Sequence, residues 1–116
     1  MFRPTLVLAL ICMVAGVSAS AQKLSGRQVF AETCSVCHAR GVAGAPTFGN
    51  HAAWRKHLAK GISVLDDHAI HGYYGYSFMP PKGGNESLSD NEIRAAVRFM
   101  VAAATRPTAK PLDPHQ

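Results

Sequence analysis

The pentapeptide "CSVCH" contains three residues that could do chemistry. Cys34 and Cys37 are thiols separated by two residues, and His38 places an imidazole directly after the second thiol. A C-x-x-C pair can be a redox dithiol, half of a zinc site, or the two attachment points of a covalently bound haem. The rest of the sequence has to decide among these three kinds of site.

The zinc and dithiol alternatives explain few of the surrounding residues. A structural zinc site needs four ligands, and His68 and His71 could complete a Cys2His2 set from one helical face. However, such a site does not require a histidine directly after the second cysteine. A redox dithiol is expected at the start of a helix that follows a strand, whereas a helical pattern precedes Cys34 and no strand pattern is visible.

Covalent haem attachment uses all three residues of the motif. The thiols of Cys34 and Cys37 can add to the two vinyl groups of one haem, and the His38 imidazole then reaches the iron from the same side. A disulfide between the two cysteines would close a very short loop and stabilise little. A covalent haem would instead supply the core that so short a chain needs.

The sixth position of the iron requires a second ligand. Two methionines lie beyond the N-terminal segment, and Met100 falls on the apolar stripe of a predicted helix, where a core role is expected. Met79 lies in a loop just before two prolines, which would stiffen a ligand loop. We therefore expect Met79 to be the sixth ligand, with His71, His68 or an open position as the alternatives.

The N-terminal segment has the layout of an export signal. Arg3 supplies a positive charge, an apolar run covers residues 6–17, and the A-x-A site ends at Ala21. This run is shorter than the roughly 20 apolar residues that a membrane-spanning helix needs. We expect residues 1–21 to be a cleaved secretory signal peptide that also removes Cys12, and we expect the protein to work in the periplasm.

The remaining chain is long enough for one domain, expected over residues 22–106, followed by a proline-rich flexible tail over 107–116. The chain carries 12 Lys and Arg against 7 Asp and Glu, a formal net charge of +5. This balance favours acidic protein partners through electrostatic steering. The absence of a Lys/Arg run argues against nucleic acid as a partner.

Helical periodicity and capping residues predict an all-α fold of three to five short helices. The predicted helices cover about residues 25–33, 51–60, 64–71 and 90–105. Asn50, Ser63 and Ser89 are the expected N-caps, and Glu92 completes a capping box with Ser89. The long glycine-rich loops between these helices suit a chain that wraps around a bulky non-protein core.

Three stretches together resemble a known family. "CSVCHARGVAGAPTFG", "MPPKGGN" and "LSDNEIRAAVRFM" are similar to class I c-type cytochromes of the cytochrome c5 kind, and the resemblance covers nearly all of residues 26–104. It implies the small cytochrome c fold, with short helices wrapped around one covalently bound haem c. Some cytochromes c5 have an extra cysteine pair before the methionine, which this chain lacks.

The resemblance also implies roles for individual residues. Cys34 and Cys37 would form the haem thioethers, and His38 and Met79 would be the axial iron ligands. The Pro46 carbonyl would accept a hydrogen bond from Nδ1 of His38, which orients the ring and raises its basicity.

Further side chains are expected around the haem and in the helix pair that encloses it. Trp54 resembles an aromatic residue near a haem propionate; a core tryptophan of the middle helix is the other interpretation, and the two roles are compatible. The haem face and the haem's apolar surroundings are expected to include Tyr73, Tyr74, Tyr76, Phe78, Phe30, Phe48 and Met100. Gly26 and Phe30 would meet Phe99 where the first and last helices cross, and Lys82 is the expected docking residue.

With both axial positions filled, the expected function is single-electron transfer by Fe(III)/Fe(II) cycling, without enzymatic activity. The expected partners are redox proteins such as membrane-bound reductases and terminal oxidases or reductases, so that contact with the membrane occurs only through partners. The alternative is a five-coordinate haem c sensor or a peroxidase-like protein in which Met79 is not bound.

Overall fold

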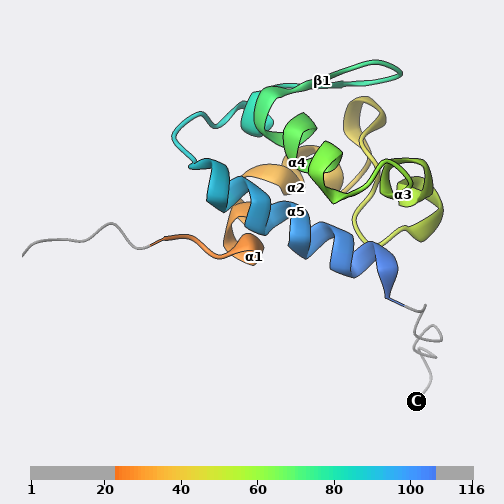
Figure 1. Ribbon diagram of the computed structural model, residues 1–116, viewed down its shortest axis with the longest axis horizontal. Coiled ribbons are helices and arrows are strands. Elements are labelled where there is room, and N and C mark those ends of the chain that lie inside the picture. Colours follow the sequence, from red (N-terminus) through yellow and green to blue (C-terminus); the bar gives the residue numbers. More distant parts are fainter. Residues whose placement is uncertain (1–22, 107–116) are drawn as a thin grey trace, which may run out of the picture.

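The structure is a computed structural model that describes residues 23–106 (Figure 1). The predicted signal peptide and the predicted C-terminal tail lie outside the described residues. No helix between residues 23 and 106 is both long and apolar enough to cross a membrane.

The described domain is mostly helical, as the sequence predicts. In chain order its elements are α1 (Gly26–Val29), η1 (Phe30–Cys34), α2 (Ser35–His38), η2 (Val42–Gly44), α3 (His51–Leu58), α4 (Ile62–His71), β1 (Tyr73–Tyr74), β2 (Phe78–Met79), η3 (Pro81–Gly84) and α5 (Asp90–Thr105). The antiparallel pair β1–β2 was not predicted, because two residues per strand are too few for a periodic pattern.

The CSVCH motif is helical, so the end of the first helix predicted at about residue 33 is wrong. The backbone stays in the right-handed helical region from α1 through η1, a single wider π-helical turn, into α2. Ser25 begins this segment, since its hydroxyl oxygen accepts from the Gln28 N–H while the Gln28 side chain accepts from the Ser25 N–H. The continuous helix places Cys34, Cys37 and His38 on one face.

The two middle helices meet at a glycine. Asn50 caps α3 as predicted, because its side-chain oxygen accepts a hydrogen bond from the Ala53 N–H at 3.0 Å. The predicted Ser63 cap of α4 is wrong, because α4 already begins at Ile62 after Gly61. Gly61 has a φ of +89°, a conformation that favours glycine and lets the chain reverse directly between the two helices.

Helix α5 runs along one side of the domain, with α1 against it (Figure 1). The predicted capping box is present, since Ser89 and Glu92 exchange hydrogen bonds at the start of α5. The second carboxylate oxygen of Glu92 accepts from the Leu24 N–H at 3.0 Å. The same carboxylate therefore caps the last helix and ties the beginning of the domain to it.

Gly26 allows α1 and α5 to touch through their backbones. A Cβ at this position would overlap the carbonyl group of Ala95. The expected contact between Phe30 and Phe99 is confirmed, with ring centroids 5.5 Å apart, but Gly26 itself faces Ala95 and not Phe99. Phe48 also stacks on Phe99, so the aromatic cluster lies beside the crossing.

The predicted apolar stripe of α5 supplies much of the core. Its members Ile93, Ala96, Val97, Met100 and Ala104 are all buried, together with Val29, Leu65, Ala69, Ile70 and Leu88 from the rest of the chain. Asp66 of α4 is also buried, and its carboxylate accepts from the Arg98 guanidinium of α5 at 2.6 Å. This pair connects two helices, and no pattern in the sequence indicated it.

The close crossing predicts an unusual response to Gly26→Ala. Helix propensity alone would make alanine more favourable than glycine by about 1 kcal/mol. The overlap with the Ala95 carbonyl should instead destabilise the domain by about 1–3 kcal/mol, measured as the free energy of unfolding in guanidinium.

Gly49→Ala is the matched control for this prediction. Gly49 has a φ of +75°, unlike the helical Gly26, but no atom lies within 4 Å of the point where a Cβ would stand. Its cost should therefore be limited to about 1–2 kcal/mol of backbone strain. A Gly26→Ala variant as stable as the parent protein would show that α1 and α5 are not in backbone contact.

Candidate functional site

A cavity of about 350 Å³ lies at the centre of the domain. Its inner wall is apolar, formed by Leu65 and Ala69 of α4 and by Val97 and Met100 of α5. Met100 therefore belongs to the core, as predicted, and also faces the cavity. The size and the apolar lining fit a bulky, mostly apolar ligand.

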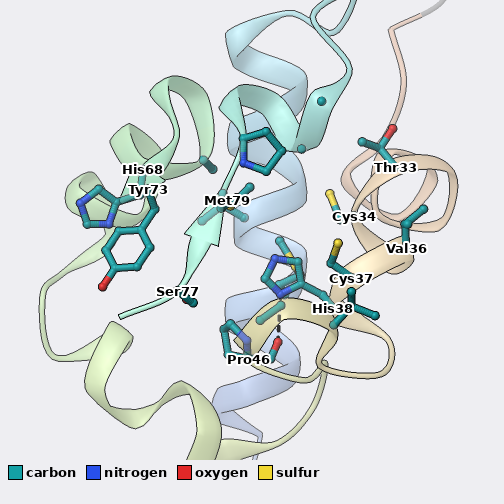
Figure 2. A pocket seen from close by; sticks show the side chains of 18 of the residues that line it. Thr33, Cys34, Val36, Cys37, His38, Pro46, His68, Tyr73, Ser77 and Met79 are labelled. Carbon is teal, nitrogen blue, oxygen red and sulfur yellow. Dashed lines mark hydrogen bonds between the residues drawn. The ribbon is translucent and has the colours of Figure 1, made fainter. Parts of the chain in front are cut away.

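The CSVCH motif forms one side of this cavity. The side chains of Cys34, Cys37 and His38 all line it, and Figure 2 shows the two sulfur atoms side by side. Burial raises the pKa of the Cys34 thiol to about 11, because an apolar environment disfavours the charged thiolate. Reactive redox dithiols have lowered pKa values, so the raised pKa of Cys34 argues against the dithiol interpretation.

The His38 ring is fixed by the predicted bond to Pro46. Its Nδ1 lies 2.9 Å from the Pro46 carbonyl oxygen, drawn as a dashed line in Figure 2. A carbonyl can only accept, so Nδ1 carries the proton and Nε2 keeps a free lone pair. Burial lowers the pKa of His38, although the Pro46 bond opposes this, and the ring stays neutral. A neutral, oriented imidazole is the form that binds a metal.

Trp54 supports His38 from α3. The two rings stack with centroids 5.8 Å apart and an interplanar angle of 24°. The Trp54 side chain is 5% exposed, and its indole N–H donates to the Thr47 carbonyl at 3.0 Å. Trp54 is therefore a core residue, as one of its two interpretations predicts, and it also lines the cavity, so its expected place beside the haem stays a prediction.

Met79 reaches the same cavity from β2 (Figure 2). Gly72 lies just before β1, opposite the end of β2, and a Cβ there would come within 3.1 Å of the Met79 carbonyl oxygen and of Pro81 Cδ. Glycine therefore lets the chain pass close behind the methionine. Positive φ values follow Met79 in the chain, at Lys82, Gly83 and Gly84, and they reverse the chain toward α5.

The aromatic run before Met79 divides between the cavity and the surface. Tyr73 and Phe78 line the cavity, Phe78 with 55% of its surface exposed. Tyr74 and Tyr76 do not line it, and Tyr76 is fully exposed. The predicted contact of Tyr76 with a cofactor is therefore wrong, because Tyr76 lies in the turn of the β1–β2 hairpin and points away from the site.

Two further predictions about the haem surroundings need correction. Phe30 and Phe48 do not line the cavity, because their rings pack against each other at 4.5 Å and against Phe99. They support the cavity wall from behind instead of forming it.

Two further histidines line the cavity wall: His68, which the sequence offered as an alternative ligand, and His57, which was not predicted there. His57 of α3 and His68 of α4 both line the cavity and pack edge-on or tilted against Tyr73. Burial, together with nearby positive charges, lowers the pKa of His57. Helical spacing from Trp54 could have indicated His57, since the two lie three positions apart on α3.

The arrangement does not support the zinc interpretation. His71 is exposed and bonded to Asp67 at 2.9 Å, so it does not share the cavity with His68. Across residues 23–106, no group of three or more His, Cys, Asp or Glu side chains is placed to hold a metal ion. Two thiols, one imidazole and one thioether around an apolar cavity fit a haem much better.

Known proteins agree with this geometry. Residues 21–100 match the family model described as cytochrome C oxidase, cbb3-type, subunit III. Cytochrome c-555 of Chlorobaculum thiosulfatiphilum is 42% identical over 78 residues, which is 66% of this chain and 91% of that protein. Cytochrome c5 of Azotobacter vinelandii is 40% identical over 77 residues, covering 66% and 90%. The chain belongs to the cytochrome c family.

Solved structures extend the similarity to the fold. The cytochrome is 38% identical, with a TM-score of 0.62, to a chain in the crystal structure of an electron transfer complex of nitrite reductase with cytochrome c. That match covers 72% of this chain and 99% of the other. A mono-heme ferrocytochrome c from Shewanella putrefaciens gives 36% identity and a TM-score of 0.57, covering 69% and 95%. The cytochrome carries one covalently bound haem c.

The Trp54 bond to Thr47 can be tested with Trp54→Phe in the haem-loaded cytochrome. Phenylalanine keeps an aromatic ring against His38 but removes the indole N–H that donates to the Thr47 carbonyl, which then accepts only from the Asn50 N–H. The free energy of unfolding in guanidinium should fall by about 0.5–1.5 kcal/mol, the usual net contribution of one hydrogen bond.

Tyr74→Phe is the control for this prediction, because it removes one polar atom from an exposed aromatic residue. Its effect should stay within about 0.5 kcal/mol. Equal stabilities of the two variants would mean that the indole N–H contributes nothing to holding the wall beside His38.

Proposed function

We propose that this protein is a periplasmic electron carrier whose haem iron is held by His38 and Met79. The observation that carries the proposal is the bond between His38 Nδ1 and the Pro46 carbonyl. This bond leaves Nε2 free on a ring that lines the same cavity as two thiols and a methionine. Such an oriented imidazole suits an axial ligand better than an acid–base catalyst, because the bond fixes its tautomer.

Cys34 and Cys37 are the residues that would bind the haem covalently through thioethers. Both line the cavity and belong to the helical segment that also carries His38. Because one rigid segment presents all three side chains, attachment at the thiols would also fix the position of the imidazole. Haem attachment at these two thiols would therefore need no large rearrangement of the cavity wall.

Met79 is a better candidate for the second axial ligand than the two histidines. His71 is turned to the surface, and its Nδ1 is bonded to Asp67. His68 lines the cavity, but its ring packs against Tyr73 at 4.9 Å, which gives it a role in the wall. Met79 lines the cavity from a strand that pairs with β1 and lies close against the backbone at Gly72.

The side chains of the cavity would favour electron transfer over chemistry on a substrate. When bound, the haem supplies one-electron chemistry, since its iron can alternate between Fe(III) and Fe(II). His38 and Met79 together would leave no axial position for a substrate. A thioether ligand and apolar walls such as Leu65 and Val97 both favour the less charged reduced state, which raises the reduction potential.

The partners and the location follow from charge and from the N-terminal segment. Redox proteins are the expected partners, and the similar chain in the electron transfer complex with nitrite reductase supports this class. Without residues 1–21 the chain has 11 Lys and Arg against 7 Asp and Glu, a formal net charge of +4, which favours partners with an acidic surface. Residues 1–21 have the pattern of a secretory signal, which supports export to the periplasm.

Substitution of Met79 tests the ligand set. Met79→Ala in the haem-loaded protein should abolish the weak far-red absorption band of a sulfur–ferric iron bond and lower the reduction potential. Met100→Leu is the control, because it replaces the other cavity methionine with an apolar side chain of similar volume and should keep the band. A parent protein without this band would favour the five-coordinate haem alternative.

Substitution of the two cysteines tests the covalent link. In Cys34→Ala/Cys37→Ala, any haem taken up should be extracted by acidified organic solvent, whereas it should stay on the parent polypeptide. The haem absorption that remains with the denatured chain measures this directly. Retention of the haem by the double variant would rule out thioethers at these positions.

A further inference from the structure

Lys82 is largely withdrawn from solvent, although it lies in a short surface loop. Its side chain is 21% exposed, and its ammonium donates to the Leu88 carbonyl at 2.7 Å. The same ammonium lies 3.2 Å from a carboxylate oxygen of Asp90, the first residue of α5. The expected role of Lys82 in docking partners is not supported, because its charge is used inside the domain.

The backbone at Lys82 is one that normally favours glycine. Its φ is +54°, and Gly83 and Gly84 follow with φ values of +62° and +87°. A lysine in this left-handed conformation is less favourable than a glycine. The position therefore places a side chain where the backbone alone would prefer none, and the two contacts of the ammonium offset that strain.

The loop that Lys82 fixes is the direct continuation of the Met79 strand. Only Pro80 and Pro81 separate the two residues, and proline restricts the backbone at both positions. A displacement of Lys82 therefore also displaces Met79, because the backbone between them has little conformational freedom. Before Met79, the pairing of Met79 with Tyr73 in the hairpin holds the other side.

The far end of the same loop is attached to the opposite side of the cavity. The Asn85 side-chain amide donates to the Thr33 hydroxyl at 3.4 Å, a long hydrogen bond, and Thr33 directly precedes Cys34. Lys82, in contrast, makes a short charged contact to the start of α5. Of these two polar contacts of the segment that follows Met79, that of Lys82 is the stronger.

We propose that Lys82 is a positioning residue for Met79, and that its contacts with Leu88 and Asp90 keep the methionine in the cavity. This inference rests on the proposed ligation of the iron by Met79. Lys82 does not touch the reacting group. It sets the fraction of molecules in which Met79 has left its position, because departure requires the loop to move away from α5.

Imidazole is a suitable probe, because it can bind ferric iron only where Met79 has left. Its apparent dissociation constant then falls in proportion as that fraction rises. In the haem-loaded protein, Lys82→Met keeps most of the aliphatic side chain but removes the charge. We expect it to bind imidazole about tenfold more tightly than the parent, which corresponds to about 1.4 kcal/mol.

Two matched variants make the test specific. Lys82→Arg keeps a charged donor and should restore an imidazole affinity within about twofold of the parent. Lys56→Met removes an exposed lysine of α3 and controls for the loss of one positive charge. It should leave the affinity unchanged. If Lys82→Met does not fold, Asp90→Asn weakens the same contact, and about a threefold change in the same direction is expected.

A second readout separates positioning from general stability. In a guanidinium titration of Lys82→Met, the far-red band should disappear at a lower concentration than the helical circular dichroism signal. Loss of both signals together, or an unchanged imidazole affinity, would overturn the role of Lys82 while leaving the ligation by Met79 intact. Absence of the far-red band in the parent protein would overturn the ligation and, with it, this role.

Discussion

The backbone contact between α1 and α5 is the constraint on which the rest of the domain depends. Gly26 against the Ala95 carbonyl fixes the start of the helical segment that ends in Cys34, Cys37 and His38. Helix α5 also holds the loop that follows Met79, because Lys82 of this loop contacts Asp90, the first residue of α5. Both sides of the cavity are therefore positioned relative to one helix.

The same helix holds the two middle helices through polar contacts. Asp66 of α4 accepts from Arg98, and Nδ1 of His51 in α3 lies 3.0 Å from the Ala104 carbonyl oxygen. A small domain with a cavity at its centre has little side-chain core with which to fix its helices. Specific contacts at separate points along α5 do part of that work, and the buried carboxylate of Asp66 needs its partner to be tolerated there.

Features determined by neighbouring residues could be predicted, whereas contacts between distant residues could not. The caps at Asn50 and Ser89, the stripe of α5 and the His38–Pro46 bond follow from short patterns or from the family resemblance. The prediction of Ser63 as the N-cap of α4 is wrong, because the helix already begins after Gly61. The Asp66–Arg98 pair joins residues 32 positions apart, for which a single sequence carries no periodic signal.

The hydrogen bond from Leu24 to Glu92 joins residues 68 positions apart and has a consequence for the order of folding. The backbone hydrogen bonds of the helical segment with both thiols are local, but so short a segment is only marginally helical without the packing of α1 against α5. The contacts of α1 with α5 require almost the whole domain to be present. The thiols therefore stay accessible on a partly ordered segment until α5 is present and the two helices cross.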